Sequence, residues 1–337
     1  IKVVMITGDH ETTARAIAKD AGIFHEGDIV LSGSQIDSMT DDELAKKLPF
    51  TSVFARATPN HKIKIIQAFK KLDKVIAMTG DGVNDAPSLV LADLGVAMGK
   101  IGTEVAKEAS DIVLLDDNFG SIISAVEEGR SIYKTIKKVI MYLFSTGVGE
   151  VLMIAGALLS GYPLPMLPAQ IIWTNFVTDG FLDVALAMEP KEKNLLSEKF
   201  KRPTKYLIDK SMVQRMILMA VTMGVGTLFL FVRVFEDDLK KAMTVAFTAM
   251  VVFQWFNVLN CRSDNLSIFR LNPFSNKYLI GALFIVITLQ MLALYNPFMQ
   301  KILHTVPLSW SEWLWILPVA ASVIMVEEIR KLFSKKS

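Results

Sequence analysis

The 337-residue chain contains a single cysteine, Cys261, and only four histidines, which are scattered along the sequence. One cysteine excludes an internal disulfide framework and any multi-cysteine metal site. The scattered histidines give no zinc site. The formal net charge is only +2, so the charge balance gives no reason to expect a nucleic-acid partner.

Hydrophobic residues make up 52% of the chain, but they are unevenly distributed. Residues 1–130 mix charged and apolar residues as a soluble α/β domain does, whereas long apolar runs begin near Val139. The chain is long enough for two domains, and this shift in composition predicts the main boundary between them.

Short apolar runs alternate with helical patterns in the first part of the chain. The predicted strands are residues 2–6, 53–56, 74–78, 94–98 and 112–115. A helix is predicted from Pro59 to Leu72, with proline in its first turn. This alternation predicts a parallel sheet covered on both faces, with ligands at the carboxyl ends of the strands.

The segment TGDGVNDAPSL, residues 79–89, directly follows one of these buried strands. Carboxylates at such an edge suit Mg²⁺, which prefers oxygen ligands and keeps several waters. Asp81 is our first choice as a direct ligand, and Asp85 is placed to ligate or to orient a water. Asn84 offers an uncharged donor to a phosphoryl oxygen. The alternative is a tight turn, which by itself does not explain all three residues at a strand end.

A second Thr-Gly-Asp sequence, residues 7–9, follows the first predicted strand. Thr7 and Gly8 can add hydroxyl and amide donors to a bound phosphoryl group, and Lys62 can neutralise its charge. Asp9, taken alone, fits a turn residue equally well.

Apolar stretches of membrane-spanning length recur in the second part of the chain. The predicted spans are residues 139–159, 167–187, 212–233, 241–260, 278–297 and 311–330. Basic residues gather after the second and fourth spans and at the C-terminus: Lys191, Lys193, Lys199, Lys201, Arg202, Lys205, Lys210, Arg262, Arg270, Lys277, Arg330, Lys331, Lys335 and Lys336. By the positive-inside rule, the soluble domain and the C-terminus are expected to be cytoplasmic.

A few polar residues fall inside the predicted spans, where each needs an explanation. Glu150 lies in the first span, and Asn175, Thr178 and Asp179 have the spacing of one helical face in the second. Asp183 extends that face by a turn. Facing carboxylate, amide and hydroxyl oxygens would form a cation site. Interhelical hydrogen bonds or protonated acids are the alternative, but two acids in lipid are costly without a function.

Several motifs in this order resemble those of P-type ATPases, the cation pumps of the haloacid-dehalogenase superfamily. They are MITGDH, ARATPNHK, MTGDGVNDAPSL and DDNFGSI followed by EEGRSIYKTIKK. VGEV and IIWTNFVTDG downstream resemble the calcium-pump branch. The resemblance implies a partial α/β, Rossmann-type, haloacid-dehalogenase-like domain followed by an all-α bundle of six transmembrane helices.

The same resemblance implies roles for individual residues. Asp81 would be a Mg²⁺ ligand with Asp85 in support, and Arg56 and Lys62 would contact the nucleotide or phosphoryl group. Thr7, Gly8, Asp9 and Asn84 would help to hold that group during catalysis. The transported cation would bind Glu150, Asn175, Thr178 and Asp179, with Asp183 and Gln254 as candidate additions.

The resemblance also implies that this chain is the C-terminal portion of a pump. Residues 1–117 would be the C-terminal part of the phosphorylation domain, 118–138 a cytoplasmic stalk and 139–337 the transmembrane domain. The phosphorylated Asp-Lys-Thr-Gly-Thr motif is not in this sequence. The expected partners are therefore the rest of the same pump: its actuator and nucleotide-binding domains and its first four membrane helices. ATP, the transported cation and the lipid bilayer are the other expected partners.

The membrane motifs favour Ca²⁺ as the transported ion. Gly147 stands where the two-site pumps have an asparagine, Gln254 where they have a glutamate, and Asp183 where they are usually apolar. These differences favour one Ca²⁺ per cycle, with proton counter-transport through Glu150 as a hypothesis.

Other functions remain open at this point. A pump for Na⁺ or Mn²⁺, a membrane-anchored phosphatase of the same superfamily, and a truncated regulator of another pump are the alternatives. The phosphatase leaves Glu150, Asn175, Thr178 and Asp179 unexplained. A multi-pass protein of the plasma membrane, or of an internal membrane if the source is eukaryotic, is expected.

Overall fold

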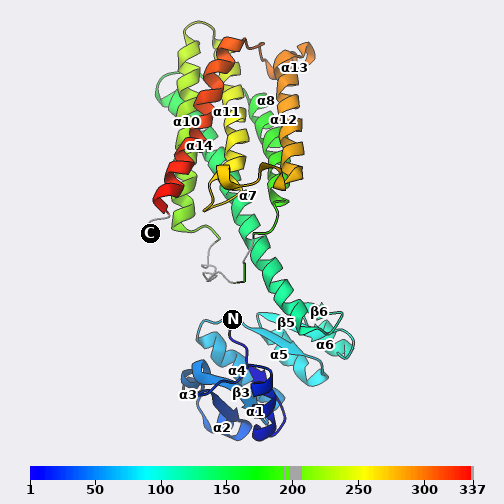
Figure 1. Cartoon of the computed structure of the whole chain (residues 1–337). Coiled ribbons are helices and arrows are strands. Elements are labelled where there is room, and N and C mark those ends of the chain that lie inside the picture. The colour runs from blue at the N-terminus through cyan, green and yellow to red at the C-terminus, as the bar shows by residue number, and fades with distance from the viewer. Residues whose placement is uncertain (193–194, 197–206, 335–337) are drawn as a thin grey trace. The chain divides into compact units, whose positions relative to one another are not determined.

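The computed structural model describes residues 1–192, 195–196 and 207–334, and it divides into two compact units (Figure 1). Ile1–Val126 form an α/β unit, and Glu127–Ser337 form a helical unit. The predicted order of an α/β part and a helical part is confirmed. Seven basic residues used to predict the orientation lie outside the described residues: Lys193, Lys199, Lys201, Arg202, Lys205, Lys335 and Lys336.

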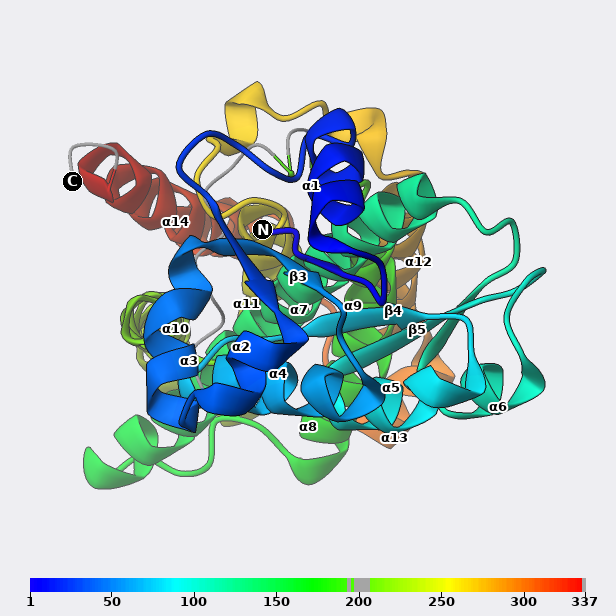
Figure 2. The same cartoon turned by 90° about the horizontal axis from the view of Figure 1, so that it is seen from below.

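The first sheet of the α/β unit is parallel, with the strand order β1-β3-β2. Its strands are β1 (Met5–Ile6), β2 (Ile29–Ser32) and β3 (Thr51–Ala55). Alternate residues of the buried central strand β3 face opposite layers of helices. Val53 and Ala55 pack with α1, whereas Phe54 packs with α2, α3 and α4. Figure 2 shows α1 on one side of these strands and α2, α3 and α4 on the other. The helices are α1 (Glu11–Asp20), α2 (Gly33–Ser38), α3 (Asp41–Lys47) and α4 (Pro59–Lys71).

The second sheet is also parallel, with the order β4-β5-β6. Its elements are β4 (Ala77–Gly80), α5 (Ala86–Leu91), β5 (Leu94–Met98), α6 (Glu104–Glu108) and β6 (Ile112–Leu114), with a 3₁₀ turn at Val83–Asp85. Met78, Leu89, Ala97 and Ala106 form its core together with Ile66 of α4. Because Ile65 and Ala68 of the same helix belong to the first core, α4 joins the two sheets.

The strands are parallel as predicted, but they form two sheets rather than one. β1 and β4, which both lead into a Thr-Gly-Asp sequence, are edge strands and do not pair with each other. Each of them therefore has one edge without a strand partner among the described residues. The two Thr-Gly-Asp sequences do follow the carboxyl ends of parallel strands, as predicted.

The helical unit is built around long helices (Figure 1). Its described α-helices, long and short, are α7 (Phe119–Leu159), α8 (Pro168–Trp173), α9 (Gly180–Ala187), α10 (Lys210–Phe235), α11 (Leu239–Cys261), α12 (Lys277–Tyr295), α13 (Pro297–Leu303) and α14 (Trp310–Ser334). A π-helix, η3 (Thr174–Asp179), joins α8 to α9. Short 3₁₀ turns, Leu48–Phe50, Ile268–Arg270 and Pro273–Ser275, complete the described elements.

Helix α11 is the central helix of this unit. Most of its residues are buried, and it packs chiefly against α10 and α14. α7 crosses α10 closely, because a Cβ atom added at Gly224 would lie only 3.0 Å from the carbonyl oxygen of Gly149. The close crossing holds the part of α7 that contains Glu150 inside the bundle.

Four of the described helices are long and apolar enough to cross a membrane: α7, α10, α11 and α12. They coincide with the first, third, fourth and fifth predicted spans. The second predicted span is divided into α8, η3 and α9, and the sixth corresponds to α14. As predicted, residues 119–141 continue without a break into the helix that contains Glu150.

Candidate functional site

The first candidate site lies where α4 meets the end of β4. Thr58 caps α4 by accepting a hydrogen bond from the backbone of His61, and the His61 ring accepts one from the backbone of Thr58. The ring also bonds to Asp37 at 2.9 Å. This cap fixes the first turn of α4, which includes Lys62. The Lys62 ammonium forms an ion pair with Asp85.

Asp85 is held from three directions at once. One carboxylate oxygen accepts from Lys62, and the other accepts from the backbone amides of Asp81 and Gly82, each at 3.2 Å. The Asp85 side chain packs against the backbone at position 80, which must be glycine, since a Cβ atom there would lie 2.5 Å from the Asp85 Cβ. Asp85 therefore fixes the conformation of the loop after β4 and also the position of the Lys62 ammonium.

The charge state of Asp85 follows from these contacts. Burial by itself would raise the pKa of Asp85, but the Lys62 hydrogen bond and the two backbone amides outweigh it, and the pKa lies below its ordinary value. Asp85 is thus a carboxylate at neutral pH. Because both of its oxygens already have partners, it fits the predicted supporting role better than that of a direct ligand.

Asp81 and Asn84 are exposed beside this pair. The backbone oxygen of Asp81 accepts from Thr103 at 2.8 Å, which fixes the loop, while no hydrogen bond to the Asp81 carboxylate is found among the described residues. One free carboxylate at a strand end fits Mg²⁺, which proteins usually hold through one or two carboxylates plus water and substrate phosphate.

Thr7, Asp9 and Arg56 form a separate group at the end of β1. The Thr7 hydroxyl donates to Asp9 at 2.9 Å, and the Arg56 amide donates to the Asp9 carbonyl at 2.9 Å. Arg56 has a positive φ of 49°, a conformation that is uncommon outside glycine. In the described part of the chain, no hydrogen bond or ion pair joins this group to Lys62, Asp81 or Asp85.

The second candidate site lies inside the helical unit, where two carboxylates are buried. Glu150 of α7 is 5% exposed and Asp179 of η3 is 3% exposed. The amide of Gln254, from α11, donates to Glu150 over a long 3.4 Å, and the Asn175 side chain also bonds to Glu150. The structure thus brings together residues from α7, η3 and α11 that are far apart in the sequence.

The segment that provides Asn175, Thr178 and Asp179 does not have the α-helical spacing on which their shared face was predicted. It is a π-helix, whose i→i+5 hydrogen bonds place more residues in each turn. Thr178 and Asp179 are buried, whereas Asn175 is exposed although its side chain reaches Glu150. Single π-helical turns occur frequently at functional sites.

Two polar residues of α7 that are not among the predicted site residues complete this group. The Tyr142 hydroxyl donates to Asp179 at 2.8 Å, and the Thr146 side chain also lies against Asp179. Residues 142, 146 and 150 are four apart, so they lie along one face of α7. That spacing is a signal by which the sequence could have revealed them.

Several buried oxygens on the helices that carry these residues have no hydrogen-bond partner in the described part of the chain. Gln254 Oε1 and Asn257 Oδ1 are buried without a hydrogen-bond partner in the described structure, while the Asn257 amide donates to Ser145 at 2.9 Å. Asp183, one turn beyond Asp179, also has a buried oxygen without a partner. Buried oxygens are nearly always paired, so this cluster has unused capacity to bind a ligand.

Glu150 and Asp179 differ from the other buried acids of the helical unit. Glu189 pairs with Arg262 at 2.9 Å, and Glu327 pairs with Arg215 at 2.7 Å. Within the described ranges, no lysine, arginine or histidine forms an ion pair with Glu150 or Asp179. An uncompensated pair of buried acids is costly, and a bound cation removes that cost.

Comparison with known proteins gives the class to which these sites belong. Residues 163–333 match the model of the family "Cation transporting ATPase, C-terminus", and residues 1–93 match "haloacid dehalogenase-like hydrolase". The chain therefore belongs to the cation-transporting ATPases.

Individual relatives carry a narrower name. The chain is 42% identical over 95% of its length to the calcium-transporting ATPase of Bacillus subtilis (strain 168), and 40% identical over its full length to calcium-transporting ATPase 1 of Saccharomyces cerevisiae. It is 38% identical over 98% of its length to the human calcium-transporting ATPase type 2C member 1. In each case the chain spans 36% of the relative's own length.

Proposed function

We propose that the protein that carries this chain is an ATP-driven pump that moves Ca²⁺ out of the cytosol through an aspartyl-phosphate intermediate. The observation that carries the proposal is the pair of buried acids, Glu150 and Asp179, without a cationic partner among the described residues. Around them, Asn175, Thr178 and Gln254 supply the neutral oxygens that Ca²⁺ takes alongside carboxylates. The names of the relatives support Ca²⁺ over Na⁺ or Mn²⁺.

The chemistry of the α/β unit would use the groups around β4. Asp81 would hold Mg²⁺, with Asp85 in support, and the metal would neutralise charge on the phosphoryl oxygens. Lys62, held by Asp85, would contact the phosphoryl group, and Asn84 would donate to it. Thr7, Gly8, Asp9 and Arg56 would approach the same group from the end of β1.

The strand edges support an aspartate that comes from elsewhere in the protein. β1 and β4 both end at a Thr-Gly-Asp sequence, and both lie at the edge of their sheets. A parallel strand that paired with both edges would turn the two sheets into one. Its carboxyl end would then lie between Thr7 and Asp81, where an aspartate could receive the phosphoryl group.

Helix α7 is the proposed mechanical connection between the two chemistries. It contains both the stalk residues and Glu150 in one uninterrupted helix. Lys134 and Lys138 on the stalk each form an ion pair with Glu192 at 2.8 Å, which ties the segment after α9 to α7. A displacement of α7 would therefore move both halves of the cation site.

The remaining parts of the proposal follow from the sequence. The α/β unit and the C-terminus would be cytoplasmic, with six spans in the helical unit. One Ca²⁺ would move in each cycle, with Asp183 as an outer ligand and with proton counter-transport through Glu150. A pH-sensitive dye inside sealed vesicles tests the last point, since calcium uptake without proton release would rule it out.

Calcium uptake by the purified protein in sealed vesicles is the decisive test of the pump. We expect ATP-dependent uptake of radioactive calcium by the wild type. We expect Asp179→Asn to lower it by more than the roughly 10–100-fold typical of losing a second-shell partner at a metal site. Glu236→Gln, an exposed acid at the end of α10, is the matched control and should transport normally.

Three other results would change the assignment. Full uptake by Asp179→Asn would remove the proposed site. ATP hydrolysis stimulated by Na⁺ or Mn²⁺, without calcium uptake, would mean that the same site binds another transported ion. Hydrolysis of small phosphate esters without any ion dependence would favour a membrane-anchored phosphatase.

A further inference from the structure

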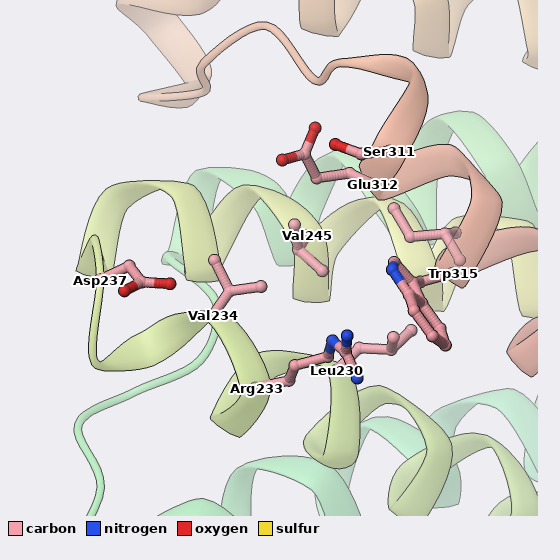
Figure 3. Close-up of a pocket in the computed structure, with 9 residues that line it drawn as sticks. Leu230, Arg233, Val234, Asp237, Val245, Ser311, Glu312 and Trp315 are labelled. Carbon is pink, nitrogen blue, oxygen red and sulfur yellow. The ribbon is translucent and has the colours of Figure 1, made fainter.

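A cavity of about 170 Å³ opens between the end of α10 and the beginnings of α11 and α14. Apolar side chains such as Leu230 and Val245 line it together with the charged and aromatic groups Arg233, Asp237, Glu312 and Trp315 (Figure 3). A cavity of about 150 Å³ holds one benzene molecule, so this one accepts a group of about that size.

Most polar groups of this cavity already have partners. Glu312 forms an ion pair with Lys241 at 2.6 Å and accepts a hydrogen bond from the Ser309 amide at 2.6 Å. Ser311 shares a hydrogen bond with Ser309 at 2.7 Å. These contacts leave Arg233 and Asp237 as the two charged groups of the cavity that remain available.

Arg233 and Asp237 form no ion pair with each other or with another described residue. The Arg233 guanidinium lies 3.9 Å from the centroid of the Trp315 ring, which fixes its plane and leaves its N–H groups free. A bare cation would be repelled by Arg233, and a bare anion by Asp237 and Glu312. A ligand that carries both charges fits the cavity better than either.

The order of residues along α10 and the turn after it indicates which kind of zwitterionic ligand would fit the cavity. Val225, Phe229 and Arg233 are four residues apart and form one stripe of α10, and Asp237 follows in the turn after the last helical residue, Phe235. Val225 is 61% exposed and Phe229 is 54% exposed, so the chain passes from exposed apolar side chains to a cation on the helix and then to an anion just beyond the helix end. A phospholipid with a primary amine has the same order of acyl chain, phosphate and ammonium.

The surroundings match the headgroup region of a membrane. α10, α11 and α14 all begin or end here, and Trp310, Trp313 and Trp315 lie within the first turns of α14. Tryptophan is enriched at membrane–water interfaces. We propose that this cavity binds the headgroup of a phosphatidylethanolamine-type lipid, with the phosphate on Arg233 and the ammonium on Asp237.

The test uses the purified, delipidated full-length protein in detergent. Its thermal unfolding is followed during titration with short-chain phosphatidylethanolamine, phosphatidylcholine or phosphatidylglycerol, and with free phosphoethanolamine. We expect saturable stabilisation that is strongest with phosphatidylethanolamine, because a trimethylated amine has no N–H to donate to Asp237 and phosphatidylglycerol has no amine.

Two variants separate the two contacts. Arg233→Gln should weaken the binding of all three lipids by about tenfold, since it removes a charge-assisted hydrogen bond. Asp237→Asn should remove the preference for phosphatidylethanolamine over phosphatidylcholine. Lys240→Gln, a nearby exposed lysine that does not line the cavity, is the control and should bind like the wild type.

Three results would overturn the proposal. They are equal stabilisation by the three lipids, a lipid preference retained by Asp237→Asn, and stabilisation by free phosphoethanolamine as strong as that by the lipid. If Arg233→Gln does not fold, the exposed position of Asp237 lets that variant carry the test alone. The readout does not depend on calcium transport, so failure of either proposal would be distinguishable.

Discussion

At the scale of single residues, Asp85 acts through its neighbours. Its two oxygens are shared between the Lys62 ammonium and the backbone amides that follow β4. The carboxylate therefore fixes the position of a cation and the shape of a loop at the same time. Both are needed wherever a phosphoryl group is held by a lysine and backbone groups.

We predict that Asp85→Asn slows phosphorylation of the protein by ATP by about 100-fold, the effect that a displacement of about 1 Å can have on a catalytic group. Asparagine keeps the shape of the side chain but loses the ion pair with Lys62. The measurement is the rate of phosphoenzyme formation from labelled ATP, with thermal unfolding to confirm folding.

Asp42→Asn is the matched control for this prediction. Asp42 approaches Lys71 at 3.9 Å on an exposed surface, where ion pairs contribute little. Phosphorylation of Asp85→Asn at the rate of this control would contradict a role for Asp85 in positioning Lys62.

The sequence predicted the acids of the proposed cation site but not all of their partners. Glu150 and Asp179 are recognisable because carboxylates are rare in apolar segments. Tyr142 and Thr146 are harder to recognise, since hydroxyl groups in such segments usually satisfy helix-to-helix hydrogen bonds, and only their four-residue spacing from Glu150 marks them. The π-helical turn was also not predictable, because it depends on hydrogen bonds rather than on residue type.

At the scale of elements, the segment after α9 is tied to α7 by charge. Glu192 is paired with both Lys134 and Lys138, and Lys137 pairs with Asp209 at 2.6 Å. The Lys138 side chain is only 4% exposed, so it depends on Glu192 to compensate its buried charge. Nearby, Lys191 and Glu128 form a more exposed pair.

We predict that Glu192→Gln lowers the free energy of unfolding by about 1–2 kcal/mol, because the nearly buried Lys138 loses its partner. Thermal unfolding should occur roughly 2–4 °C lower for each kcal/mol. The control Glu128→Gln, whose partner is exposed, should cost about 0.5 kcal/mol or less. Equal effects of the two variants would contradict the prediction.

The ion pairs of Glu192 with Lys134 and Lys138 also predict how stability depends on pH. Burial would raise the pKa of Glu192, but Lys134 and Lys138 outweigh it, so the pKa lies below the ordinary 4.5. A pKa that is lower in the folded state than in the unfolded state stabilises the fold at pH values above the ordinary pKa. This stabilisation is lost as the pH falls through the pKa of the folded state. The difference between wild type and Glu192→Gln should thus be constant near neutral pH and should shrink only below about pH 4.5. A difference that already shrinks between about pH 6 and 7 would contradict it.

Elements with strong local signals were predicted well. The helix from Pro59 ends at Lys71, one residue before the predicted end, and the strand Leu94–Met98 has the predicted bounds. Lys2–Val4 were predicted to belong to the first strand but do not, because β1 pairs only at Met5 and Ile6. Pairing partners, which the local pattern does not reveal, decide where such a strand begins.

At the scale of the whole molecule, the two candidate sites lie in separate units, and α7 runs from the end of the first unit into the second. The division of the α/β unit into two sheets could not be predicted, because periodicity gives the presence of strands but not which edges meet. The same limit applies to the helical unit, where only tertiary packing shows that Gln254 meets Glu150.

The number of ions moved in each cycle is a property of the whole protein. We predict that it binds one Ca²⁺ per phosphorylation site, because the described helices hold one pair of buried acids without a cationic partner, Glu150 and Asp179. Gly147 contributes no side chain, and Gln254 is neutral and donates its amide to Glu150. Equilibrium binding of radioactive calcium, divided by the maximal phosphoenzyme level, gives the ratio.

The matched variant is Gly147→Asn combined with Gln254→Glu, which adds an amide oxygen and a carboxylate next to the existing pair. A Cβ atom at position 147 would meet no other atom within 4 Å, so α7 can accept the asparagine without a clash. We expect the binding ratio to rise from one towards two in this variant, since the added oxygens lie beside Glu150. A ratio of two in the wild type would contradict the prediction, because it would require a second set of ligands that does not depend on positions 147 and 254.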